Sequence, residues 1–298
     1  MTPCVTAIRQ STSPDLLGES PVWDDRIGRL YWVDGVSNLI RFHDLSEDSF
    51  GSIEMPSSVG AVALCADQDQ LLVGLADGIY TLKVSDPKSQ LEPLYKPEPR
   101  NERVRFNDGK VDRQGRFLIG TMGIFAEPVG ELIRLSPDGS VEKLASGIRI
   151  SNSLCFSPDG AALYFADSLD RAIRAYSYSA DAEPLTDPRR CIDTRPYHSG
   201  PDGATVDADG YIWVALVQAG KIGRFAPDGT LDRMVEAPVD MPSCVNFGGS
   251  DLSVLFMTSI KDSGSGRAIS RHPSAGYLFS IEGLGVTGIA EPKFGQQS

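Results

Sequence analysis

Four side chains that carry oxygen donors stand at matching points of the sequence and suggest metal chemistry. Glu19, Asn107, Asn152 and Asp202 each lie five residues before a short turn. Two carboxylates held close together away from water repel each other unless a proton or a cation compensates them. Because the set contains no His or Cys, it favours hard cations such as Ca²⁺, Mg²⁺ or Mn²⁺. Zn²⁺ also fits such a set when waters complete its ligands, so the residues leave open whether the cation is Ca, Mg, Mn, Zn or Fe.

These positions belong to a repeat of the whole chain. Short β-rich runs and polar turns recur, and Asp-Gly pairs fall in five of the turns, where tight turns favour them. Intervals of 41 to 50 residues separate six equivalent turns, at Asp24, Ala66, Asp112, Ser157, Asp207 and Gly248. Six units of four short strands predict an all-β fold, a six-bladed β-propeller with four-stranded blades. One period runs across the midpoint, so we expect a single domain over 1–298.

Two features of this repeat leave an alternative open. Residues 161–183 contain neither Gly nor Pro and fit an amphipathic helix, although their alignment with five sister units favours strands. Residues 4–8 are a candidate for an extra strand that closes the ring. The sequence does not decide this second point.

The innermost strands of a propeller present equivalent positions to one central channel, so residues in the same phase should meet at one height. The set in this phase comprises Glu19, Ala61, Asn107, Asn152, Asp202 and Ser243. Arg105 lies two residues before Asn107, on the same side of an extended strand, and is expected to reach the channel mouth and donate to a polar substrate. An outward salt bridge is the alternative for Arg105. His198, in the loop ahead of Asp202, is expected to be an exposed loop histidine.

Composition excludes several classes of protein. The chain has 28 basic and 40 acidic residues and a formal net charge of −12, which disfavours nucleic acid and anionic membranes as partners. No apolar run reaches the length of a membrane span, and no secretory signal is visible. The cysteine count of 5 is odd and no Cys-x-x-Cys occurs, so reduced and mostly buried thiols are expected. We therefore expect a cytoplasmic protein.

Four motifs, in the right order and on the right blades, resemble the regucalcin/gluconolactonase family of six-bladed propeller lactonases. They are residues 17–23, residues 105–112 with 120–122 after them, residues 150–154 and residues 201–203. The resemblance implies that Glu19, Asn152 and Asp202 are the metal ligands and that Arg105 and Asn107 bind substrate. Some family members carry an acidic substrate contact shortly after residues 120–122; here residues 123–125 intervene and Glu127 comes later.

The function expected from these residues is the divalent-metal-dependent hydrolysis of a sugar lactone, gluconolactone-like, to its aldonic acid. The metal would bind the lactone carbonyl oxygen and stabilise the oxyanion that forms on attack. Asp202 is the candidate general base for the attacking water. A metal-bound hydroxide is the alternative nucleophile, with Asp202 orienting it, because contact with a metal lowers a carboxylate's pKa. A metal-dependent phosphotriesterase and a non-catalytic ligand-binding propeller are the alternative functions.

Overall fold

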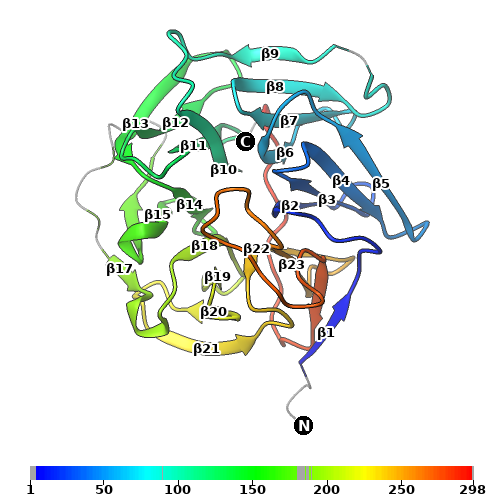
Figure 1. The fold of residues 1–298 in the computed structure, drawn as a ribbon, viewed down its shortest axis with the longest axis vertical. Coiled ribbons are helices and arrows are strands. Elements are labelled where there is room, and N and C mark those ends of the chain that lie inside the picture. The colour runs from blue at the N-terminus through cyan, green and yellow to red at the C-terminus, as the bar shows by residue number, and fades with distance from the viewer. Residues whose placement is uncertain (1–4, 89, 180–184, 186–187, 189, 297–298) are drawn as a thin grey trace.

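Six four-stranded antiparallel sheets are arranged as blades around one axis (Figure 1). The computed structural model describes residues 5–88, 90–179, 185, 188 and 190–296. It confirms the all-β, six-bladed β-propeller predicted from the repeat. In each blade the strands run outward from the axis in chain order, except in the blade that closes the ring.

The strands of the six blades occupy four equivalent positions. The innermost strands, beside the axis, are β2 (Gly18–Asp24), β6 (Val59–Leu64), β10 (Val104–Val111), β14 (Ser151–Phe156), β18 (Pro201–Val206) and β22 (Pro242–Gly248). The second strands are β3 (Arg29–Asp34), β7 (Gln70–Leu75), β11 (Phe117–Gly123), β15 (Ala162–Asp167), β19 (Ile212–Leu216) and β23 (Val254–Ser259). The third strands are β4 (Leu39–Asp44), β8 (Gly78–Lys83), β12 (Gly130–Leu135), β16 (Ala172–Ser177), β20 (Lys221–Phe225) and β24 (Phe279–Glu282). The outer strands are β5 (Ser49–Glu54), β9 (Glu92–Tyr95), β13 (Val141–Ile148), β17 (Arg190–Asp193), β21 (Leu231–Glu236) and β1 (Thr6–Arg9).

The structure has strands at both places where the sequence left an alternative open. β1 pairs antiparallel with β24, for example Ile8 with Ser280, so the N-terminal strand completes the sixth blade and closes the ring. The segment that also fitted a helix forms β15 and β16, joined by one turn of 3₁₀ helix at Ser168–Asp170. Residues 180–183 of that segment lie outside the described residues.

Apolar side chains fill the space between neighbouring blades. Six clusters of buried hydrophobic residues lie one at each junction of adjacent sheets. Trp213 meets Phe247 edge-on between the fifth and sixth blades, with ring centroids 5.8 Å apart. Trp23 stacks on Phe256 at 6.0 Å where the sixth blade meets the first. This packing removes apolar area from water at every junction and holds the inner strands in fixed positions around the axis.

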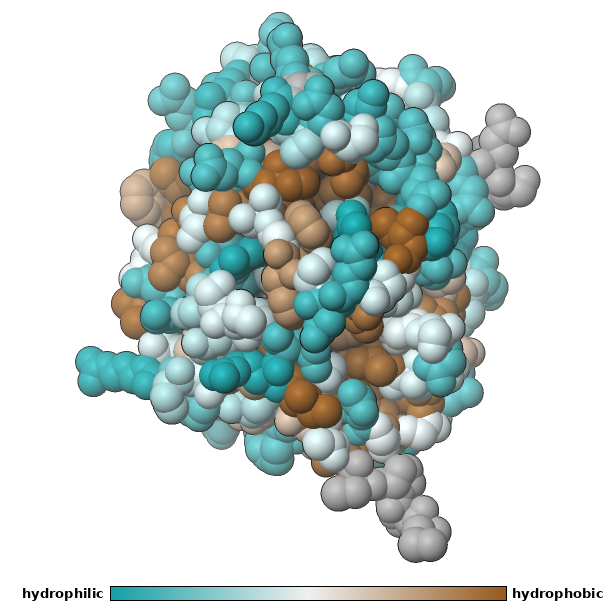
Figure 2. Space-filling model, turned by 90° about the vertical axis from the view of Figure 1, so that its right-hand side faces the viewer, coloured by the Kyte–Doolittle hydropathy of each residue, from teal (hydrophilic) through white to brown (hydrophobic). Residues whose placement is uncertain are grey.

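The outer surface is less apolar than these junctions. The outer strand β5 leaves most of its side chains partly or fully exposed, as does β13. Figure 2 shows one side of the molecule, where apolar and hydrophilic residues are interspersed and hydrophilic ones cover the upper edge. Of the described residues, no helix is long and apolar enough to cross a membrane. Three thiols, those of Cys65, Cys155 and Cys244, are buried and not disulfide-bonded, whereas Cys4 lies outside the described residues.

A C-terminal segment crosses the channel at the end where the innermost strands finish. Gly288 bridges to Asp207 after β18, and Phe294 bridges to Cys65 after β6. In Figure 1 this red segment passes behind the inner strands. Between these two points Glu291 pairs with Lys110 of β10, with Nζ and Oε1 2.7 Å apart. The segment therefore covers one end of the channel and leaves the other end, where the inner strands begin, for a site.

Candidate active site

Every innermost strand is irregular near its beginning. The register against the second strand slips by one residue in all six blades, between Glu19 and Val22 in β2 and between Asn152 and Cys155 in β14, for example. Ser20 and Ser153, inside these two bulges, have φ angles of 50° and 58°. A bulge bends its strand and turns side chains away from strict alternation. The bulges therefore aim several consecutive polar side chains at the axis.

Hydrogen bonds connect the third, fourth and fifth blades at this level. Arg105 donates from Nη1 to Asn107 Oδ1 at 2.9 Å. Asn107 donates from Nδ2 to Asn152 Oδ1 at 3.3 Å, and Asn152 donates from Nδ2 to Ser168 Oγ at 2.9 Å. Ser168 in turn donates to the carbonyl of Pro201, the residue before Asp202, at 2.8 Å. These hydrogen bonds determine, for Asn107 and for Asn152, which end of the carboxamide is the NH₂ group and which is the oxygen.

Two carboxylates, from the first and fifth blades, complete the cluster. Asp202 is 7% exposed, and burial followed by the charge of Asp108 raises its pKa to about 8. Burial is also the main reason that the pKa of Glu19 lies well above its usual range, and the nearby charges of Asp202 and Asp108 add to the effect. Arg105 opposes this shift in Glu19. The two carboxylates therefore face the same water-poor space, where both cannot carry a negative charge without compensation.

The five residues predicted from the sequence consequently lie at one end of the channel. Arg105 turns toward Asn107 and Glu19 and does not form the outward salt bridge that was its alternative. The other two positions in the same phase are not part of the polar cluster. Ala61 is fully buried and apolar, and the hydroxyl of Ser243 donates to the carbonyl of Gly18 at 2.5 Å.

Asp108 is a member of the site that the sequence reasoning missed. It follows Asn107 in β10, and strict alternation would turn it away from the channel. The register slips between Phe106 and Gly109, so Asp108 also faces inward, where its Oδ2 accepts from the amide of Leu154 at 2.8 Å. Burial raises the pKa of Asp108 to about 6. The available signal was the Gly after it, since Gly inside a strand often marks a bulge.

Two further residues flagged in the sequence lie around the mouth. His198 is exposed, as expected, in a left-handed conformation with φ of 56° after the 3₁₀ turn Arg195–Tyr197. Glu127 lies on the loop between β11 and β12, where it pairs with Arg103 and accepts from the amide of Phe125 at 3.0 Å. Its carboxylate therefore stabilises the conformation of this loop.

The donor chemistry of the cluster is carboxylate plus carboxamide. Within the described part of the chain, no group of three or more His, Cys, Asp or Glu side chains gathers in a metal-binding arrangement. The oxygens of Glu19, Asn152 and Asp202 instead come from three different blades. Such a set matches hard cations, which prefer oxygen ligands and retain waters. Beside it, Arg105 and Asn107 offer donors and acceptors for the oxygens of a polar ligand.

Comparisons with known proteins identify the family of this chain. The family model described as the SMP-30/Gluconolactonase/LRE-like region matches residues 17–261. The 6-deoxy-6-sulfogluconolactonase of Pseudomonas putida is 34% identical over 285 residues, which cover 94% of this chain and 96% of the relative. Regucalcin of Xenopus laevis is 34% identical over 286 residues, covering 93% and 94%.

A solved structure extends the likeness to the whole fold. The structure of the calcium-binding protein regucalcin from Agrobacterium tumefaciens superposes with a TM-score of 0.88 at 28% identity and covers 97% of both chains. The matched residues include all four bulged strands that carry the axial cluster. The chain therefore belongs to the SMP-30/gluconolactonase/LRE-like family of propeller proteins.

Proposed function

We propose that this protein hydrolyses a sugar lactone to the corresponding aldonic acid and that it uses one bound divalent cation. The observation that carries the proposal is the pair of carboxylates Glu19 and Asp202, whose pKa values are raised mainly by burial and which lie in one cluster with Arg105 and Asn107. The relatives named as lactonases support the reaction class. A lactone carbonyl placed over this cluster would meet both a charge-stabilising site and a water-activating carboxylate.

The residues present fit a cation. Burial is the main cause that raises the pKa of both carboxylates, and the charge of Asp108 adds to both shifts. A bound cation would offset these effects, because it favours the charged form of each carboxylate. Asn152 contributes a neutral oxygen whose direction is set by its bond to Ser168. Oxygen donors of this kind favour Ca²⁺, Mg²⁺ or Mn²⁺ over softer metals. Because a regucalcin of similar structure is described as calcium-binding, Ca²⁺ is the first cation to test.

The mechanism assigns a role to each side chain. The cation, when bound, supplies a Lewis acid that polarises the lactone carbonyl and stabilises negative charge on its oxygen. Glu19, Asn152 and Asp202 would hold it. Asp202 would also orient the attacking water and accept its proton as the bond to the carbonyl carbon forms. The bond between that carbon and the ring oxygen then breaks, and Asp202 returns the proton to the ring oxygen, which becomes a hydroxyl group of the aldonic acid.

Two residues of β10 hold the substrate beside these ligands. Arg105 donates from its guanidinium group to ring or hydroxyl oxygens, and a guanidinium has several N–H groups beyond the one that bonds Asn107. Asn107 fixes the direction of Arg105 through that bond and presents its own carboxamide to the same space. Correct placement of the carbonyl relative to the water is worth several powers of ten in rate.

A lactone panel on metal-stripped protein tests the proposal. Gluconolactone and other sugar lactones would be assayed by a pH indicator, with Ca²⁺, Mg²⁺, Mn²⁺, Fe²⁺ and Zn²⁺ restored one at a time. We expect activity to return with at least one cation and Asp202→Asn to lower kcat/KM by at least about a hundredfold. Asp209→Asn is the matched control, because Asp209 follows the same strand β18 but lies on the opposite face and is exposed.

Two results would contradict the proposal. One is lactone hydrolysis that survives both metal stripping and the loss of the Asp202 carboxylate. The other is turnover of an aryl phosphotriester, measured alongside, with no lactone turnover under any cation, which would favour the phosphotriesterase alternative.

A further inference from the structure

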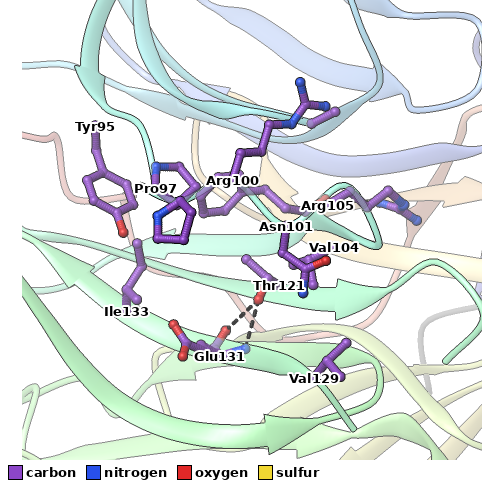
Figure 3. Close-up of a pocket in the computed structure, with 13 residues that line it drawn as sticks. Tyr95, Pro97, Arg100, Asn101, Val104, Arg105, Thr121, Val129, Glu131 and Ile133 are labelled. Atoms are coloured by element: carbon purple, nitrogen blue, oxygen red, sulfur yellow. Dashed lines mark hydrogen bonds between the residues drawn. The ribbon is translucent and has the colours of Figure 1, made fainter. Parts of the chain in front are cut away.

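A pocket of about 180 Å³ lies beside Arg105, between the second and third blades (Figure 3). Its walls are mostly apolar and include Tyr95, Pro97, Val104 and Val129. An apolar cavity of about 150 Å³ is large enough to bind benzene. The pocket therefore has the size and the walls to take one six-membered ring.

The polar groups on the pocket floor already have partners. Thr121 accepts from the amide of Glu131 at 2.8 Å and donates to its carbonyl at 3.2 Å, as the dashed lines of Figure 3 show. The carboxylate of Glu131 pairs with Lys143 at 2.6 Å. A ligand in the pocket therefore does not have to supply a partner for the Thr121 hydroxyl or for the Glu131 carboxylate.

One cation at the rim has no ion-pair partner within the described part of the chain. Residues 96–105 carry four basic and two acidic side chains within a chain of net charge −12. Lys96 and Arg103 each pair with a carboxylate of a neighbouring loop. Arg100 lines the pocket, is exposed, and forms no ion pair among the residues that the structure describes. A guanidinium at the edge of an apolar pocket favours an anionic group on the ligand.

Arg105 joins this pocket to the axial site. It lines the pocket, while its guanidinium group points away from the pocket walls in Figure 3 and bonds Asn107. A substrate whose reacting part lies over the axial carboxylates can therefore pass Arg105 and place an outer substituent between the blades.

We propose that this pocket is a subsite for an aromatic or similarly ring-sized apolar substituent that bears an anionic group. The apolar walls take the ring, and Arg100 pairs with the anion at the rim. The subsite extends the proposed lactonase function, on which it rests, by assigning the chemical class of the substituent outside the lactone ring.

Binding of phenylacetate to the calcium-loaded, full-length protein tests the subsite by calorimetry. Val129→Phe reduces the pocket volume, and because Val129 is 39% exposed the larger ring does not have to enter the core. Arg100→Gln removes the rim charge. Lys83→Gln is the matched control, since Lys83 is an exposed cation at the opposite end of the second blade.

We expect the Kd for phenylacetate to rise about tenfold in each pocket variant, a loss typical of one charge-assisted contact, and to be unchanged in Lys83→Gln. The neutral analogue 2-phenylethanol should bind the wild type about tenfold more weakly than phenylacetate does, and equally weakly in Arg100→Gln. Phenylacetate affinity that is equal in all four proteins, or a preference for the anion that survives Arg100→Gln, would overturn the subsite.

Gluconolactone hydrolysis separates this inference from the proposed function. Both pocket variants should leave kcat and KM for gluconolactone unchanged, because this lactone carries no ring substituent to place in the pocket. Gluconolactone hydrolysis by a protein that does not bind phenylacetate overturns the subsite and leaves the lactonase function intact. Absence of any lactone hydrolysis, with phenylacetate still bound in the pocket, overturns the lactonase function and with it the subsite's role in substrate binding.

Discussion

Asn107 donates a hydrogen bond from Nδ2 to Asn152 Oδ1 at 3.3 Å, which joins the carboxamides of β10 and β14 across the boundary between two blades. The same Nδ2 donates to the carbonyl of Ser151 at 2.8 Å. Asn107 therefore connects a proposed substrate-binding residue, Arg105, to a proposed cation ligand. Changes at this carboxamide should affect binding and turnover together.

Replacement of Asn107 by Leu, which keeps a similar volume, should lower kcat/KM for the accepted lactone by about ten- to a hundredfold. The buried carbonyl of Ser151 and the side chain of Asn152 lose a donor, at a cost of about 1–3 kcal/mol. Steady-state kinetics would measure this. Asn246→Leu is the control, because Asn246 also bonds across a blade boundary, to the carbonyl of Pro21 at 2.8 Å. It should lose stability and keep its kinetic constants, and an equal loss of kcat/KM in both variants would refute the role of Asn107.

Removal of the divalent cation should lower the thermal stability of the protein as well as its activity. A ligand that binds only the folded state at 100 times its Kd adds about 2.7 kcal/mol to the free energy of unfolding. Scanning calorimetry with chelator and with excess Ca²⁺ would measure the difference in Tm. Asp202→Asn should abolish this difference, whereas Asp209→Asn should retain it. A Tm that does not depend on the cation in wild-type protein would argue against a bound ion at the axis.

The free energy of unfolding should decrease as the pH rises from about 4 to about 6, because Asp15 loses its proton in this range. Burial raises the pKa of Asp15 to about 6, although Arg41 pairs with it at 2.6 Å and Trp32 donates to it at 2.7 Å. The folded state therefore binds this proton more tightly than the unfolded state, where the pKa is near 3.8. Its contribution is fully present below pH 4 and is lost as the pH rises through 6, by up to about 3 kcal/mol.

The Asp15 effect can be isolated by comparison with Asp15→Asn at constant Ca²⁺ concentration. Urea unfolding at a series of pH values would give the difference in unfolding free energy between wild type and variant. This difference should decrease from pH 4 to pH 6. A difference that is constant or increases with pH contradicts the raised pKa.

The ion pair between Lys110 and Glu291 should hold the C-terminal segment over the closed end of the channel. Lys110→Met leaves the Glu291 carboxylate buried without its partner, which should cost about 3 kcal/mol of unfolding free energy. The double variant Lys110→Met, Glu291→Leu should recover most of this loss, since an apolar pair of similar size needs no compensation. Chemical denaturation of the wild type, the single variant and the double variant would measure their free energies of unfolding. If the double variant is no more stable than Lys110→Met, the loss of unfolding free energy does not come from the unpaired Glu291 carboxylate.

The axial cluster shows how far a periodic sequence predicts a site. Glu19, Asn107, Asn152 and Asp202 could be found because each occupies the same phase of a repeat, and a propeller brings equal phases to equal heights. Asp108 could not be found in this way. Its orientation depends on a one-residue slip in β10, and alternation along an ideal strand predicts the opposite face.

The order of residues along the chain predicts the number of blades, their four-stranded form and the equivalent polar positions of the inner strands. These are properties of local periodicity, which each unit of about 45 residues carries without reference to the others. The pairing of β1 with β24, the Lys110–Glu291 contact and the ring-sized pocket beside Arg105 depend on residues far apart in sequence. They exist only after the six units have packed into a closed ring, because no single unit contains both sides of any of these contacts.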